Sequence, residues 1–185
     1  MRWFRKREEI EPLAVTMTGV RLGDRLLAIG AADPSLVAQL ARKTGLTGRV
    51  CLVEPDEGRA ALAGAAIERA GALAETISAP WGALPLDDNS FDVAIARDAL
   101  FTMTSDDRAQ CLADAFRLLR SGGRLVVIEA SASGGLASLL SRRPADPAYR
   151  SQGGATQALT AAGFAAVRVI AERDGVVYVE GAKRA

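Results

Sequence analysis

Four short segments each follow an apolar run, and they carry the side chains best suited to holding a ligand. These segments are residues 30–34, 54–56, 79–81 and 97–99. Together they offer carboxylates that accept hydrogen bonds, a tryptophan ring that can stack, and an arginine. If the apolar runs are parallel strands, all four segments lie at the carboxyl edge of a sheet, where open α/β sheets bind ligands. The sequence therefore predicts a ligand site at this edge.

The residue types that most often carry acid–base and metal chemistry are scarce. The chain has no His and only two Cys, with Cys51 in an apolar run and Cys111 in a helical pattern. His is the commonest general base, and transition metals are held mainly by His and Cys. We therefore expect no metal site, expect both thiols to be reduced and packed, and assign no catalytic residue.

The elements that must position the four segments alternate between strand and helix. Five apolar runs are predicted as strands: 25–29, 49–54, 73–78, 91–96 and 124–129. Asp33 and Asp56 are expected to cap the two helices that follow the first two strands, with Pro34 at the first helical position. Ser105 is expected to cap a longer helix that ends at 121–123. This alternation predicts an open parallel sheet with right-handed crossovers.

The last third of the chain departs from this alternation. Residues 165–172 and 176–181 are strand-like and are joined through Asp174-Gly175, which predicts a hairpin. The sheet is therefore expected to finish with an antiparallel pair. Residues 130–154 are rich in Ser, Gly, Pro and Arg, which predicts a long loop with room for one short helix. Such a loop is either a lid over the site or a surface excursion without a role.

Length and charge limit the classes of function. The 185 residues, 49% of them hydrophobic, suit a single domain over 1–185 with an N-terminal segment at 1–20. The net charge is +1, so we expect no nucleic-acid partner. No apolar run approaches 18 residues, so we expect no membrane span and a cytoplasmic protein. The basic, aromatic start at 1–7 is either a solvated terminus or a binding arm.

Two further motifs resemble a known family. Residues 84–92, LPLDDNSFD, and residues 118–126, LLRSGGRLV, are similar to segments before the fourth and fifth strands of class I S-adenosylmethionine-dependent methyltransferases. The resemblance is strongest to the small group (methyltransferase type 11) related to ubiquinone and menaquinone biosynthesis enzymes, and it covers most of the chain. It implies an α/β, Rossmann-like methyltransferase fold: a seven-stranded, mostly parallel sheet that ends in an antiparallel hairpin, with helices on both faces. Taken alone, both motifs are structural. The first is a polar loop that ends where Phe91 enters the core, and in the second Gly122 and Gly123 can supply positive-φ positions after a helix.

The resemblance implies S-adenosylmethionine as the cofactor and points to residues that would bind it. Glu54 matches the acidic residue that accepts hydrogen bonds from both ribose hydroxyls in the family, and Pro55 lies beside it. Two acceptor oxygens on one carboxylate suit a diol. Gly30 and Ala31 match the start of the family's glycine-rich turn, which lets the backbone approach the cofactor.

Three more residues are assigned to the cofactor with an alternative for each. Asp33 either contacts the cofactor's ammonium group or only caps the helix. Trp81 either stacks on the adenine or covers the edge of the sheet. Arg97 follows the fourth strand, where the family places residues that face the methionine part or the acceptor. The alternative is a surface ion pair between Arg97 and Asp98.

The chain departs from the family's pattern at four positions. Ala28 replaces an acidic residue of the first strand, and Ala32 and Pro34 replace parts of the glycine-rich turn. Pro80 stands in the approximate place of an aspartate that contacts the adenine amino group. Each substitution removes a polar contact or adds bulk where the cofactor approaches.

Two hypotheses for function follow. The first is a methyltransferase that acts on a small or medium-sized acceptor molecule. The alternative is a catalytically inactive methyltransferase-fold protein, with a decayed cofactor site, that acts as a binding or assembly partner. Methyl transfer from a sulfonium needs mainly positioning and exclusion of water, so the absence of His is compatible with the enzyme, which we favour. The sequence gives no indication of the acceptor or of the oligomeric state.

Overall fold

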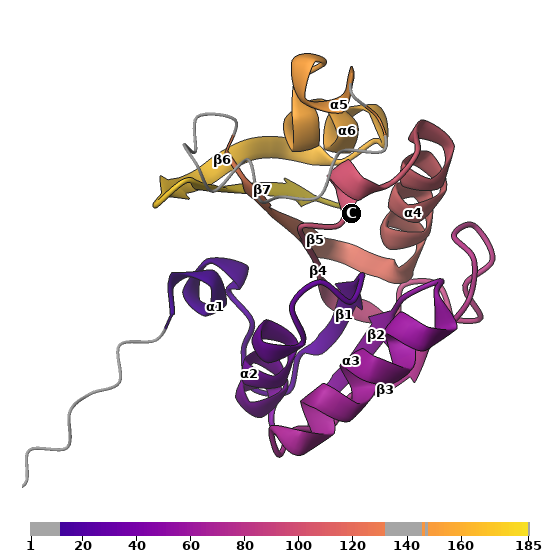
Figure 1. Ribbon diagram of the computed structural model, residues 1–185. Coiled ribbons are helices and arrows are strands. Elements are labelled where there is room, and N and C mark those ends of the chain that lie inside the picture. Colours follow the sequence, from indigo (N-terminus) through magenta and orange to yellow (C-terminus); the bar gives the residue numbers. More distant parts are fainter. Residues whose placement is uncertain (1–11, 132–145, 147, 185) are drawn as a thin grey trace, which may run out of the picture.

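Seven strands form one sheet in the order β3-β2-β1-β4-β5-β7-β6 (Figure 1). The computed structural model describes residues 12–131, 146 and 148–184. The strands are β1 (Arg25–Ile29), β2 (Arg49–Val53), β3 (Glu75–Ile77), β4 (Phe91–Arg97), β5 (Leu119–Ala130), β6 (Ala165–Arg173) and β7 (Val176–Ala182). Neighbouring strands from β3 to β5 run parallel, and β7 pairs antiparallel with both β5 and β6. The predicted strand pattern and closing hairpin are confirmed.

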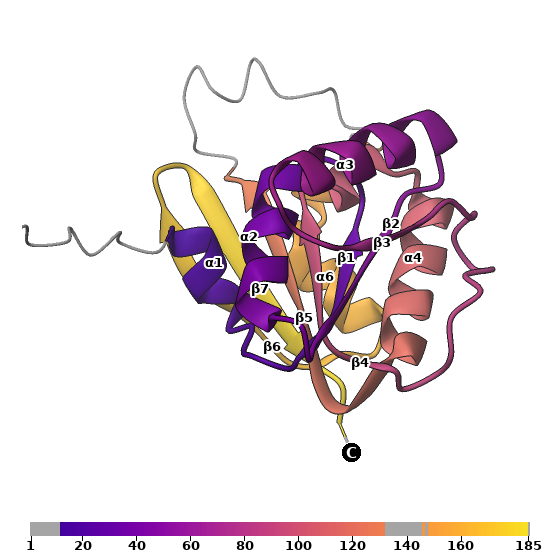
Figure 2. The ribbon, with the colours of Figure 1, turned by 90° about the horizontal axis from the view of Figure 1, so that it is seen from below.

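Helices cover both faces of the sheet, so strand side chains on both faces are apolar. The alternating side chains of β1 are an example. The helices are α1 (Leu13–Thr18), α2 (Pro34–Thr44), α3 (Glu57–Arg69), the 3₁₀ helix η1 (Leu100–Thr102), α4 (Ser105–Leu118), α5 (Ala148–Ser151) and α6 (Gly154–Ala161). Leu26 and Ala28 pack into the cluster that contains α1, α2 and α3. Leu27 and Ile29 pack into the cluster that contains α4, α5 and α6. Figure 2 shows α2 and α4 on opposite sides of the strands.

Two of the three predicted helix caps are confirmed. The Asp33 carboxylate accepts a hydrogen bond from the backbone N–H of Leu36 at 2.9 Å, and Pro34 is the first residue of α2. Asp56 caps α3 in the same way. The cap of α4 was predicted one residue too late, because Thr104 and not Ser105 accepts the hydrogen bond from the start of the helix. Thr and Ser are adjacent here, and both are good N-caps.

The turn at residues 121–123 was predicted to end a helix, and the structure places it inside β5. Gly122 donates a backbone hydrogen bond to Lys183 at 2.9 Å, and Lys183 donates one to Gly123 at 2.8 Å. Gly122 has a φ of +76° as expected, but Gly123 does not have a positive φ. A Cβ at Gly123 would lie 2.9 Å from the Arg120 carbonyl oxygen. Close approach of the backbone, and not a left-handed conformation, explains the second glycine.

Two predicted segments are described in part. Within 130–154 the structure places α5 and the start of α6, whereas 132–145 and 147 lie outside the described residues, as do residues 1–11. The question of a lid and that of a binding arm therefore remain predictions. Cys51 and Cys111 are both buried and unpaired, as expected for packed thiols. No helix in the described part of the chain is long and apolar enough to cross a membrane.

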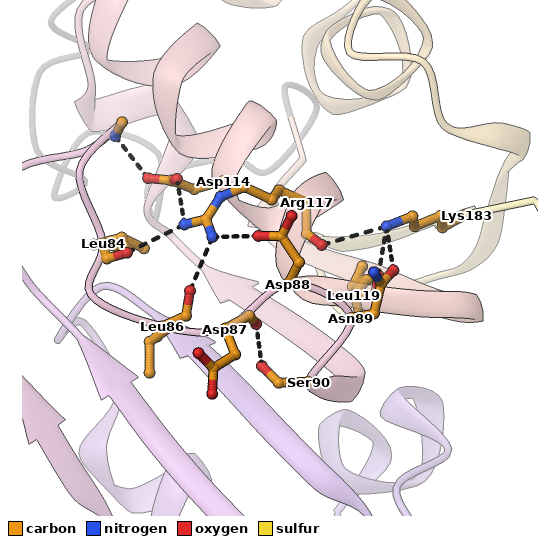
Figure 3. Close-up of polar contacts among 11 residues, drawn as sticks. Leu84, Leu86, Asp87, Asp88, Asn89, Ser90, Asp114, Arg117, Leu119 and Lys183 are labelled. Carbon is orange, nitrogen blue, oxygen red and sulfur yellow. Dashed lines mark hydrogen bonds and ion pairs between the residues drawn. The ribbon is translucent and has the colours of Figure 1, made fainter.

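Arg117 on α4 holds the segment 84–92, the first of the two family-like motifs (Figure 3). Its guanidinium donates to the carbonyl oxygens of Leu84 at 3.2 Å and Leu86 at 2.9 Å. The same group pairs with Asp88 at 2.6 Å and with the buried Asp114 at 3.1 Å. One side chain thus fixes the path of the loop that leads into β4.

Lys183 secures the other end of this loop from beyond β7 (Figure 3). Its ammonium group donates to the Asn89 side chain at 2.9 Å and to the Leu119 carbonyl at 2.7 Å. Asn89 has a φ of +56°, which asparagine tolerates better than most residues. The motif therefore has a structural role, as its residue types alone suggested.

We expect Arg117→Met to lower the free energy of unfolding by about 1–3 kcal/mol, because partly buried acceptors lose their donor. Urea unfolding measures this change. Arg173→Met is the matched control, since that side chain is 72% exposed and pairs only with its neighbour Asp174. The control should stay within about 0.5 kcal/mol of the unsubstituted protein. Equal losses in the two variants would contradict the role given to Arg117.

Candidate functional site

The four ligand-binding segments proposed from the sequence meet around one cavity of about 170 Å³ at the carboxyl edge of the sheet. Each segment contributes to its lining, and residues from α3, from η1 and the residue after it, and from α4 complete it. The lining residues are Gly30, Ala32, Glu54, Pro55, Arg59, Trp81, Asp98, Ala99, Thr102, Met103 and Asp107. The edge predicted to hold a ligand is therefore also where the chain leaves space.

Gly30 directly follows β1 in a conformation that favours glycine. Its φ is +80°, and its N–H donates to the Val53 carbonyl of β2 at 2.8 Å. A Cβ at this position would lie 3.0 Å from the Cβ of Ala99, on the loop after β4. Both the positive φ and the nearby Ala99 disfavour a larger side chain at this position. Glycine here therefore lets the loops after β1 and β4 lie in contact.

Glu54, directly after β2, is the central polar group of the cavity. The residue is only 4% exposed. One carboxylate oxygen accepts from the Ala31 N–H at 3.0 Å and lies 2.9 Å from the Arg59 guanidinium. The other oxygen accepts from the Asp56 N–H at 3.2 Å. Of the roughly four acceptor positions of a carboxylate, three are occupied by the protein itself.

Arg59 is a member of the site that the sequence did not indicate. It lies in the first turn of α3, five residues after Glu54, and its side chain is 44% exposed. Because Asp56 caps this helix through the Arg59 N–H, at 2.7 Å, the position of the arginine follows from the cap. The spacing between an acid at a strand end and a cation in the next helical turn is the signal that could have predicted this pair.

Of the residues predicted after β3 and β4, Trp81 and Asp98 line the cavity and Arg97 does not. Trp81 is 9% exposed and belongs both to the cavity lining and to the core beneath α4. Asp98 lines the cavity with a φ of +47°, held by hydrogen bonds to and from β5. Arg97 does not line the cavity. Its guanidinium pairs with Asp98 at 3.1 Å, which is the alternative given for it from the sequence.

Other sequence-assigned positions lie outside the cavity lining. Asp33 is engaged as the cap of α2, and Ala31 takes part through its backbone N–H. Ala28 is buried in the apolar cluster beneath α2, and Pro80 is exposed. Neither Ala28 nor Pro80 offers a polar side chain, so the contacts that a carboxylate would make there are absent.

Known proteins match the chain over much of its length. Residues 27–127 match a family model described as "Methyltransferase domain". The ubiquinone/menaquinone biosynthesis C-methyltransferase UbiE of Escherichia coli is 32% identical over 119 residues, which are 63% of this chain and 47% of that protein. The chain thus spans about half the length of the curated relatives it matches.

Solved structures show the same fold at low sequence identity. A SAM-dependent methyltransferase from Aquifex aeolicus superimposes with a TM-score of 0.72 and 18% identity, covering 91% of this chain and 87% of that one. The [4+2]-cyclase SpnF superimposes with a TM-score of 0.68 and 19% identity, covering 93% and 78% of the two chains. Since one neighbour is a cyclase, the fold by itself does not identify the reaction.

The role of Asp33 can be tested by stability alone. We expect Asp33→Ala to lower the free energy of unfolding by about 0.5–2 kcal/mol, the usual loss when a helix N-cap is removed. Asp33→Ser keeps a capping oxygen and should preserve most of that free energy. Chemical denaturation of both variants measures the difference. A serine variant as unstable as the alanine variant would show that Asp33 contributes more than a cap.

Proposed function

Since the chain belongs to the methyltransferase domain family of S-adenosylmethionine-dependent enzymes, we propose that it transfers a methyl group from S-adenosylmethionine to a small-molecule acceptor. The observation that carries the proposal is the buried carboxylate of Glu54, which lines a cavity at the carboxyl edge of the sheet beside Gly30 and Trp81. The name of the relative UbiE refers to C-methylation in quinone biosynthesis, which supports a small acceptor.

The nucleoside end of the cofactor fits three of the residues around this cavity. Glu54 would accept hydrogen bonds from the ribose hydroxyls, and Trp81 offers an aromatic surface for the adenine. Gly30 permits close approach of the backbone. The cavity of about 170 Å³ is smaller than the range of about 300–1,000 Å³ usual for ligands of this class. Arg59 is a lining group that can turn toward solvent, because its side chain is 44% exposed.

The amino-acid end of the cofactor needs a carboxylate that this chain supplies in a different place. The family's acidic residue of β1 is replaced by Ala28, and Asp33 caps α2 and does not line the cavity. Asp98 lines the cavity next to Ala99, which in turn lies against Gly30. We therefore assign the contact with the cofactor's ammonium group to Asp98.

When bound, the cofactor would supply a methyl group carried on a sulfonium. The leaving group is then a neutral thioether, which needs no further activation. The residues around the cavity therefore have to bind, orient and exclude water. Trp81 and Met103, each 9% exposed, give the cavity apolar walls, while Glu54 and Asp98 provide the polar contacts at its edge. The alternative, an inactive methyltransferase-fold protein, requires that these contacts fail to hold the cofactor.

Calorimetric titration with S-adenosylmethionine and S-adenosylhomocysteine separates the two hypotheses. We expect saturable binding of both, and we expect Glu54→Ala to weaken it by about 1–3 kcal/mol, the scale for losing a charged hydrogen-bonding partner. Absence of binding at millimolar cofactor would favour the inactive protein. Undiminished affinity in the Glu54→Ala variant would remove Glu54 from the cofactor site.

Arg59→Met tests whether the ion pair with Glu54 competes with the cofactor. The Arg59 side chain is 44% exposed, whereas that of Glu54 is 5% exposed. Taking about 1 kcal/mol for the pair, its removal should tighten cofactor binding by up to about fivefold. Arg69→Met, at the end of the same helix and bonded only to the Ala65 carbonyl, is the matched control and should leave affinity unchanged. Weaker binding in the Arg59→Met variant would show instead that Arg59 contacts the cofactor.

A further inference from the structure

A second cavity, of about 240 Å³, lies at the same edge of the sheet, between the end of β5, the helices α5 and α6, and the β6–β7 hairpin. Val169, Val177 and Val179 form one wall of it. Glu129 and Arg150 are among its polar lining residues. Nothing in the proposed function uses this space.

Glu129 is a buried carboxylate in this second cavity. It is the penultimate residue of β5 and is only 6% exposed. The Tyr149 hydroxyl of α5 donates to its carboxylate, at 3.1 and 3.2 Å from the two oxygens. Burial raises the pKa of Glu129 to about 7, although the hydrogen bond from Tyr149 lowers it. At neutral pH this group can therefore either hold or release a proton.

Charged groups on the surrounding elements act on the Glu129 carboxylate and change its pKa. Asp98 at the end of β4 raises the pKa of Glu129, and Arg150 of α5 lowers it. Glu172 of β6 lines the same cavity and accepts a hydrogen bond from Ser131. Arg108 of α4 stacks on the ring of Tyr149, 4.4 Å from its centroid, and fixes the phenol that contacts Glu129.

The two cavities share a boundary. Asp98 lines the first cavity, and Ala130 lines the second. The Ala130 N–H donates to the Asp98 carboxylate at 3.3 Å. The loop after β4 and the end of β5 therefore border both cavities, and a methyl donor in the first and an acceptor in the second would have to meet across this boundary.

We propose that the second cavity binds the methyl acceptor, a small neutral ring bearing an acidic hydroxyl group, and that Glu129 removes the hydroxyl proton. This inference rests on the proposed function. The valine wall suits an apolar ring, and a cavity of about 240 Å³ suits a single ring, since pockets for drug-sized ligands measure about 300–1,000 Å³. Tyr149 is a positioning residue, because it contacts Glu129 and is not among the residues that line the cavity.

The reaction balances without a further reactant. The Glu129 carboxylate takes the proton from the acceptor hydroxyl and becomes a neutral acid. An electron pair of the acceptor oxygen forms the bond to the methyl carbon, and the carbon–sulfur bond of the sulfonium breaks with its electrons remaining on sulfur. The products are a methyl ether and a neutral thioether, and Glu129 later returns its proton to water.

The probe for this proposal is 4-fluorophenol, followed by ¹⁹F NMR with the full chain, with and without S-adenosylmethionine. Without cofactor, binding should broaden and shift the fluorine signal. Thr156→Trp places a large ring in the cavity from an exposed position on α6 and should abolish that change. Thr160→Trp, one turn further along the same helix, should not. Phenol binding that survives Thr156→Trp would overturn the assignment of the cavity.

With cofactor present, a new signal from 4-fluoroanisole should appear, and its rate of formation should rise with pH to a plateau above about 7, where Glu129 is ionised. Glu129→Gln keeps an acceptor for Tyr149 and should lower the rate by at least about 100-fold. Tyr149→Phe removes a hydrogen bond that lowers the pKa of Glu129, so the midpoint of the pH profile should move to higher pH.

Each remaining outcome decides against one of the two proposals. An unchanged rate in the Glu129→Gln variant, or an unmoved midpoint in the Tyr149→Phe variant, would overturn the role of Glu129. A protein that binds both cofactor and phenol but forms no anisole would overturn it as well. Failure to bind the cofactor at all contradicts the proposed function, and the response of phenol binding to Thr156→Trp then still decides the assignment of the cavity.

Discussion

The hydrogen bonds of the Glu54 carboxylate hold the carboxyl edge of the sheet together. This one buried group joins the turn after β1, through the Ala31 N–H, to the start of α3, through Asp56 and Arg59. A buried carboxylate is costly unless its oxygens are satisfied, so they have to be met by these groups or by a ligand that replaces one of them. Glu54 therefore links the turn after β1 to the start of α3, and both border the first cavity.

The turn after β1, which departs from the family's glycine-rich pattern, still allows the hydrogen bond between the Ala31 N–H and Glu54. Gly30 keeps the positive φ and the close contact with Ala99. The neighbouring Asp33 and Pro34 serve the start of α2. The turn thus contributes backbone shape and one N–H, while the carboxylates that can meet a cofactor come from the ends of β2 and β4. In the two proposals the cavities at this edge have separate roles: the first holds the nucleoside beside Glu54, and the second holds the acceptor beside Glu129, which Tyr149 positions.

The sequence predicted most of the fold because its signals are local. Apolar runs, an Asp-Pro helix start and an Asp-Gly hairpin each specify structure within a few residues. The turn at Gly122 and Gly123 was assigned wrongly because its hydrogen-bonding partner, Lys183, lies 60 residues beyond Gly123 in the chain. No local pattern shows that such a segment is paired.

The candidate site was predictable only in outline, because most of its contacts join residues that are distant in the sequence. The carboxyl edge follows from strand order, and Glu54 follows from the resemblance to the family. Burial and partners, however, depend on contacts between distant elements: Tyr149 meets Glu129 across 20 residues, and the path between them passes through residues 132–145, which lie outside the described part of the chain. An acidic residue at the end of the apolar run 125–128 is the one local signal that could have drawn attention to Glu129.

A crystal structure of the full chain with S-adenosylhomocysteine tests the central claim most directly. The account predicts that both ribose hydroxyls lie within hydrogen-bonding distance of the Glu54 carboxylate, with the Ala31 N–H still bound to it and the Arg59 side chain turned toward solvent. A nucleoside bound elsewhere, or one bound while the pair between Glu54 and Arg59 stays closed, would contradict it.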